Sequence, residues 1–171
     1  MYWDEAQLSN QPTLRRCYRP RGPHQPLPTN APRQLRYLHG AVSYPDGACY
    51  FRELSGMTSL CCIEFLRGLL EAFPQRQIRV ICDSAPGHHS EAMHAFVRKH
   101  PRLRLQYQPT YAPWTNPVER VWQQMRRGVT HCHDLPDIRT VVATALNWCQ
   151  SFAAAPATVR RLVSFQSPSA S

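Results

Sequence analysis

The spacing of hydrophobic and polar positions along the chain predicts five short strands. Residues 35–43 and 48–54 have the composition of strands, and the Tyr-Pro-Asp-Gly turn between them predicts a hairpin. Residues 77–82 form an apolar run typical of a buried strand, and residues 103–107 alternate apolar and polar positions. Residues 2–5, two aromatic residues followed by two acids, are expected to be the stub of a further strand.

Segments with helical spacing or with helix-ending residues separate these strands. Thr58 can cap a helix that Pro74 ends, and Pro101 stops the next helix. Pro117 is tolerated in the first turn of a third helix, which begins at residues 115–116. The predicted helices therefore cover residues 58–73, 90–100, 115–129 and 136–152.

The mixed order of strands and helices is typical of an α/β fold with helices on both faces of one sheet. The 171 residues suit one domain, and a hydrophobic share of 43% is enough for a core. Residues 9–34 are rich in Pro and Arg and are expected to be a long loop, either a linker or a basic segment beside DNA. Residues 156–171 have a weaker pattern and are expected to be a tail, which leaves residues 1–155 as the domain.

The charge of the chain favours a polyanionic partner. There are 20 basic residues against 11 acidic ones, which gives a formal net charge of +9. A domain this basic often binds nucleic acid, although the charge can also simply keep copies of a soluble protein apart. Arg120, Arg126 and Arg127 are candidate phosphate contacts on the third helix, where a solvated basic face would look the same.

Cysteine usage and hydropathy favour a cytoplasmic protein. The seven cysteines are an odd number and contain no Cys-x-x-Cys pair, which favours reduced thiols over a disulfide framework. Apolar runs are too short to span a bilayer, and residues 1–8 lack the basic start and apolar run of a secretory signal. We therefore expect no membrane contact.

Three acids stand where an α/β sheet collects the groups of an active site. Asp83 directly follows the predicted buried strand, Asp4 follows the first strand in the same way, and Glu119 lies in the first turn of a helix. Carboxylates that converge at one end of a sheet form a site for hard cations such as Mg²⁺ and Mn²⁺. A single Asp after a strand is more often a turn-former or a helix cap, so spacing alone leaves both interpretations open.

Two segments around these acids resemble the signature segments of DDE transposases, in the bacterial insertion-sequence branch of the mariner-like superfamily. They are Asp-Ser-Ala-Pro-Gly-His-His-Ser at residues 83–90 and Gln-Pro-Thr-Tyr-Ala-Pro-Trp-Thr-Asn-Pro-Val-Glu-Arg-Val-Trp at residues 108–122. Thirty-five residues separate Asp83 from Glu119, which is close to the spacing typical of that family. The opening Tyr-Trp-Asp-Glu resembles the first-strand motif of the family, with Asp4 as the first acid.

The resemblance implies a ribonuclease-H-like fold, a mixed five-stranded sheet flanked by helices, here with its first strand clipped. It implies that Asp4, Asp83 and Glu119 are the catalytic residues and hold two Mg²⁺ ions, for which Mn²⁺ can substitute. His88 matches a recurrent His of the family that positions a phosphate or a carboxylate, and packing at a helix start is an equal alternative. Asn116 is expected to cap the helix that carries Glu119.

The activity implied by the resemblance is metal-dependent cleavage of DNA at transposon ends, followed by strand transfer into target DNA. The expected partners are double-stranded DNA, as terminal inverted repeats and as target, and a second copy of the chain in a homodimer. The expected location is the bacterial cytoplasm, in association with the nucleoid. Two alternatives stay open: a ribonuclease-H-like nuclease for RNA or repair intermediates, and a catalytically inactive transposase remnant that only binds DNA or dimerises.

Overall fold

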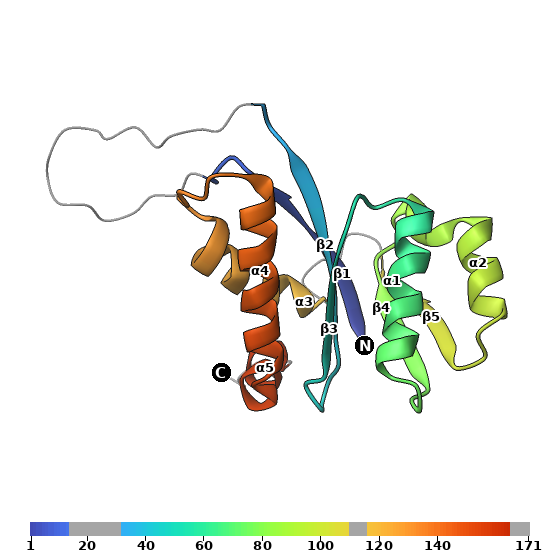
Figure 1. The fold of residues 1–171 in the computed structure, drawn as a ribbon. Helices are drawn as coiled ribbons and strands as arrows, with labels where there is room; N and C mark the ends of the chain where they lie inside the picture. The colour runs from blue at the N-terminus through green and yellow to red at the C-terminus, as the bar shows by residue number, and fades with distance from the viewer. Residues whose placement is uncertain (14–31, 110–115, 165–171) are drawn as a thin grey trace, which may run out of the picture.

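A five-stranded mixed sheet forms the centre of the fold in the computed structural model, which describes residues 1–13, 32–109 and 116–164 (Figure 1). The strands are β1 (Tyr2–Ser9), β2 (Leu35–Val42), β3 (Cys49–Leu54), β4 (Ile78–Cys82) and β5 (Leu103–Tyr107). Their order across the sheet is β3-β2-β1-β4-β5. β2 runs antiparallel to both β1 and β3, whereas β4 runs parallel to both β1 and β5.

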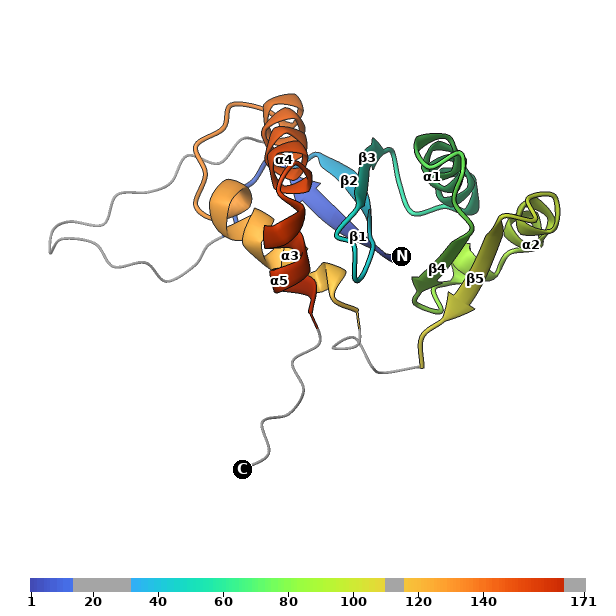
Figure 2. The same ribbon diagram turned by 90° about the horizontal axis from the view of Figure 1, so that it is seen from below.

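Helices cover both faces of this sheet. They are α1 (Ser59–Ala72), α2 (Glu91–Arg98), α3 (Val118–Met125), α4 (Ile138–Ala153) and α5 (Pro156–Val163). α1 and α2 lie on one face, and α3, α4 and α5 lie on the other, as Figures 1 and 2 show. The predicted mixed sheet flanked by helices is therefore confirmed, together with the hairpin of β2 and β3.

Side chains of β1 alternate between two hydrophobic cores, one on each face of the sheet. Trp3 is fully buried in the core under α1 and α2. Ala6 and Leu8 point to the other face and are buried in the core under α3, α4 and α5. By the same alternation, Asp4 points to the face covered by α3, and Glu5 points to the face covered by α1.

Two elements extend beyond their predicted bounds. The expected stub at residues 2–5 is the start of an eight-residue central strand, β1, which pairs with β2 along its whole length. Residues 156–163, expected as part of a tail, form α5, and its Val159 and Val163 are fully buried in the core. Neither segment contains a long apolar run, so contacts with neighbouring elements stabilise it rather than its own pattern.

Parts of two sequence predictions lie outside the described residues. These are residues 14–31 of the expected long loop and residues 110–115 of the second signature segment. Within the described ranges, no helix combines the length and the apolar composition that a membrane crossing needs.

α3 packs directly over Gly40 of β2, the residue paired with Asp4 of β1. A Cβ atom at this position would lie 2.5 Å from Cη2 of Trp122 and 2.8 Å from Cδ1 of Phe51. Trp122 is fully buried and lies one turn after Glu119 on α3. The missing side chain at Gly40 therefore sets how closely α3, and with it Glu119, approaches β1.

We expect Gly40→Ala to lower the free energy of unfolding by about 1–3 kcal/mol, the usual range for overpacking a core. The added methyl group must displace the Trp122 ring, which has no space to move in a fully buried position. Urea unfolding followed by circular dichroism measures the change. Gly56→Ala is the matched control, because a Cβ atom there meets nothing within 4 Å. Equal stability of the two variants would contradict the close packing of α3.

Candidate active site

The register of the sheet brings Asp4 and Asp83 to the same level. β1 and β4 are parallel, with Tyr2 opposite Ile81, and each acid lies two residues further along its chain. Asp83 directly follows the last residue of β4, as the sequence predicts. Glu119 lies in the first turn of α3, on the face of the sheet to which Asp4 points. These three residues are called the acid triad below.

The charge environment of Asp4 shows that the members of the acid triad influence one another. The pKa of Asp4 is raised to about 7, first by burial and then by the negative charge of Glu5, with further contributions from Glu119 and Asp83. Repulsion between carboxylates favours the protonated form of one of them, and a bound cation removes this repulsion. The arrangement is therefore suited to a positively charged ligand.

His88 holds the carboxylate of Asp83. Nδ1 of His88 donates to Oδ1 of Asp83 at 2.9 Å, and the backbone N–H of Ala85 donates to the same oxygen at 3.0 Å. The hydrogen bond from His88 is the main reason why the pKa of Asp83 lies below its ordinary value. The Asp83 side chain is 58% exposed, whereas that of His88 is 3% exposed, so the buried ring is the fixed partner of the pair.

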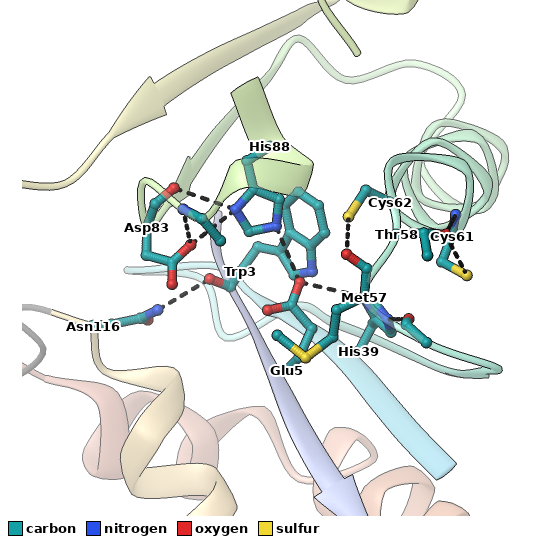
Figure 3. A network of polar contacts seen from close by, with 12 residues as sticks. Trp3, Glu5, His39, Met57, Thr58, Cys61, Cys62, Asp83, His88 and Asn116 are labelled. Carbon is teal, nitrogen blue, oxygen red and sulfur yellow. Dashed lines mark hydrogen bonds and ion pairs between the residues drawn. The ribbon is translucent and has the colours of Figure 1, made fainter. Parts of the chain in front are cut away.

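Both ring nitrogens of His88 face oxygen acceptors. Nδ1 contacts Asp83, and Nε2 donates to Oε1 of Glu5 at 3.2 Å (Figure 3). Burial alone would lower the pKa of His88, but hydrogen bonds, first of all the one to Asp83, outweigh burial and raise it. The ring is therefore a doubly protonated imidazolium between two carboxylates. Of the two roles considered for His88, this geometry favours the positioning of a carboxylate.

Glu5 is a buried carboxylate for which the sequence predicted no role. Its side chain is 4% exposed and lies between His88 and His39, whose Nδ1 is 3.4 Å from the same carboxylate oxygen. His39 is paired with Glu5 across β1 and β2, and its Nε2 donates to the carbonyl oxygen of Gly56 at 2.9 Å. Burial would raise the pKa of Glu5, but the two histidines outweigh burial and lower it. The pairing follows from the strand register, which the sequence does not give.

A compact group of potential metal ligands lies beside the acid triad. In the part of the chain that the structure describes, the side chains with ligand atoms within 4.8 Å of one another are Glu5, Cys62 and His88. The acid triad is spread more widely than this group. However, the compact group contains a thiol and an imidazole, which suit softer ions than Mg²⁺. Of these two groups of described residues, the acid triad is the one with the all-oxygen donors that a hard cation prefers.

Asn116 ties the start of α3 to β1. Its Nδ2 donates to the carbonyl oxygen of Trp3 at 3.0 Å, and its Oδ1 accepts from the N–H of Val118 at 3.2 Å. The second bond is the kind of capping contact that the sequence predicts, and the first adds a link that the sequence did not indicate. Because Trp3 precedes Asp4 and Val118 precedes Glu119, the two bonds hold these acids in a fixed relation.

The three candidate phosphate contacts have different surroundings. Nη1 of Arg120 donates to two backbone carbonyl oxygens at the end of α5, at 3.2 and 2.8 Å, so this side chain anchors α5. Arg126 lies 3.5 Å from Glu119, and Arg127 is exposed on the π-helical turn after α3 (Arg126–Thr130). Arg126 and Arg127 are therefore better placed than Arg120 to meet a phosphate.

Solved structures of Mos1 transposase have a similar fold. The Mos1 paired-end complex with the left transposon end matches with a TM-score of 0.66 at 15% identity, over 95% of this chain and 50% of that one. The Mos1 mariner paired-end complex with Mn matches with the same TM-score, identity and coverage. Together with the sheet order, this similarity defines the chain as a domain with a ribonuclease-H-like fold.

The sequence comparison gives the family. A family model described as DDE superfamily endonuclease matches residues 1–142, and the chain belongs to this family. A 39 kDa protein of insertion element IS630 from Shigella sonnei is 28% identical over 133 residues, which make up 77% of this chain. The chain spans 39% of the length of that relative and about half of the Mos1 chains.

We expect the metal-free protein to become less stable, relative to Asp4→Asn, as the pH rises through 7. The pKa of Asp4 in the folded protein, about 7, is above its ordinary value of 3.8. The contribution of Asp4 to the free energy of unfolding is therefore fully present below pH 3.8. It is lost as the pH rises through 7, where Asp4 must ionise among other carboxylates. Thermal unfolding in EDTA between pH 5 and 8 measures the difference between the two proteins. A difference that does not change with pH would show that Asp4 ionises normally.

Proposed function

We propose that the acid triad holds two divalent metal ions, Mg²⁺ with Mn²⁺ as a substitute, and that the domain cleaves and joins DNA at transposon ends. The observation that carries this proposal is the placement of Asp4 and Asp83 at the same level of two adjacent parallel strands, with Glu119 on the face of the sheet to which Asp4 points. Bound at these oxygens, the metal ions would stabilise charge on the attacking and leaving oxygens of a phosphodiester. Membership of the DDE superfamily endonuclease family supports the same activity.

Different parts of the fold fix each member of the acid triad. Asp4 lies on the central strand, which is paired on both sides. Asp83 lies on the loop after β4 and receives its orientation from His88. Glu119 lies on α3, whose start is tied to β1 by Asn116. Groups that orient a ligand in this way typically change metal affinity or activity by about 10- to 100-fold when they are removed.

The proposed substrate is double-stranded DNA, both as terminal inverted repeats and as target. The Mos1 structure with a transposon end and the net charge of +9 support this assignment. We propose that two copies act as a homodimer on DNA, at the nucleoid of a bacterial cell, as the insertion-element relative suggests. Because α5 contributes to the core, we place the end of the catalytic domain after Val163 rather than at residue 155.

We expect Asp83→Ala to reduce nicking of supercoiled plasmid DNA by the purified chain by at least about 100-fold, because a proposed metal ligand is removed. The assay is run in Mg²⁺ and in Mn²⁺, and nicked and joined products are separated on agarose gels. Glu91→Ala is the matched control, because Glu91 is an exposed acid on α2 that pairs with Arg98 at the surface.

The products separate the proposal from its alternatives. Nicks together with joined DNA products are the result expected of a transposase domain. Nicks in RNA or in RNA–DNA hybrids without joining would favour a ribonuclease-H-like nuclease. DNA binding without any nicking in Mn²⁺ would favour the inactive remnant, and equal nicking by Asp83→Ala and the wild type would contradict the role of the acid triad.

A further inference from the structure

We propose that Glu5 is a positioning residue, which holds the His88 ring against Asp83 and so aims the Asp83 carboxylate, and that Glu5 does not itself bind the catalytic metal. Glu5 can have this role only if the acid triad holds metal as proposed above. The observation behind it is a continuous chain of polar contacts that runs from Asp83 through His88 and Glu5 to His39.

The strand geometry places Glu5 apart from the acid triad. Glu5 follows Asp4 directly, so the two side chains point to opposite faces of β1. Asp4 faces α3 and Glu119, whereas Glu5 shares its face with Trp3, whose ring lies 4.3 Å from the ring of His88. Figure 3 shows Glu5 between His88 and His39, on the side of β1 covered by α1. The side chain is therefore directed to the histidines.

The contacts connect an exposed loop to the rigid centre of the sheet. Asp83 is 58% exposed and lies beyond the end of β4, where no strand pairing fixes its side chain. His88 lies on a short 3₁₀ turn (Pro86–His89), which is also outside the sheet. Glu5 and His39 lie on β1 and β2, opposite one another in a fully paired stretch. Glu5 is therefore the first link of the chain that belongs to a rigid element.

Without Glu5, His88 has other partners to which it can turn. The sulfur of Cys62 is within 4.8 Å of the ligand atoms of both Glu5 and His88, and the hydrogen bond of its thiol, to the carbonyl oxygen of Met57, is long at 4.0 Å. Contact with Trp3 restricts the plane of the ring but does not select which edge faces Asp83. The hydrogen bond from Nε2 to Glu5 makes this selection, because it fixes the opposite edge of the ring.

Two substitutions separate positioning from metal binding. In Glu5→Gln, the amide oxygen can accept from Nε2 of His88, and the amide group still faces Nδ1 of His39 as a polar partner. The polar chain therefore stays complete, although the charge is lost. Glu5→Leu has a similar size but makes neither bond. A metal ligand would instead lose its function in both variants.

The measurement is Mn²⁺ binding to the full 171-residue chain by isothermal titration calorimetry, together with nicking. We expect Glu5→Leu to weaken Mn²⁺ binding by about 10- to 100-fold, and Glu5→Gln to bind within about threefold of wild type, close to the limit of such comparisons. Gln7→Leu is the matched control, because Gln7 lies on the same face of β1, two residues further along, and is exposed. Asp83→Asn is the reference for a lost ligand.

The Mn²⁺ affinities of the Glu5 and Asp83 variants distinguish failure of the inference from failure of the proposed function. Equal loss in Glu5→Gln and Glu5→Leu would overturn the inference, because charge rather than hydrogen bonding would then matter. Wild-type Mn²⁺ binding in Glu5→Leu, together with lost binding in Asp83→Asn, would overturn the positioning role of Glu5 and leave the proposed function intact. Wild-type binding in Asp83→Asn would instead contradict the proposed function.

A second pair of variants covers the case in which Glu5→Leu does not fold. His88→Asn places an amide donor where Nδ1 contacts Asp83, and His88→Gln places one where Nε2 contacts Glu5. We expect both variants to weaken Mn²⁺ binding by about 10- to 100-fold, because each keeps only one of the two contacts of the ring. Wild-type Mn²⁺ binding in His88→Asn would overturn the inference, because the contact with Asp83 would then be sufficient without Glu5.

Discussion

Successive side chains of a β-strand point to opposite faces, and the adjacent acids of β1 show what this constraint produces. Asp4 points to the face of α3, and burial, followed by the negative charge of Glu5, raises its pKa to about 7. Glu5 meets two histidines on the face of α1, and its pKa falls. The pKa values of two adjacent carboxyl groups are thus shifted in opposite directions. This difference matches the proposed roles, in which Asp4 binds a cation and Glu5 supports His88.

The acid triad combines exposure with fixed geometry. A metal ligand that also faces a DNA phosphate must be reachable from solvent, and the side chain of Asp83, 58% exposed, meets this requirement of the proposed function. An exposed side chain on a loop has many orientations, so its direction must come from buried neighbours. His88 is such a buried neighbour for Asp83 on the loop, and Asn116 is one for the start of α3. The buried polar groups of this domain therefore support the exposed ones.

The sequence allowed the hairpin and the helices α1 to α4 to be predicted, because these depend on local spacing, and its motifs singled out the three acids as candidates. It did not reveal the full length of β1 or the helix α5, since both are stabilised by packing against distant elements. It also missed the partnership of Glu5 with His39, which are 34 positions apart and meet only through the strand register. His88 was noticed as a motif residue, but its two carboxylate partners required three dimensions.

The pairs Asp4–Gly40 and Glu5–His39 are neighbours in the ladder between β1 and β2. A slip of one residue would exchange the faces of Gly40 and His39, because side chains alternate along each strand. The imidazole would then meet the indole of Trp122, which leaves no room even for a methyl group, and a buried carboxylate would lose its partner. A misaligned β2 would therefore lose both its packing and the polar contacts behind the candidate site. The same residues thus determine the alignment of the strands and the arrangement of the site.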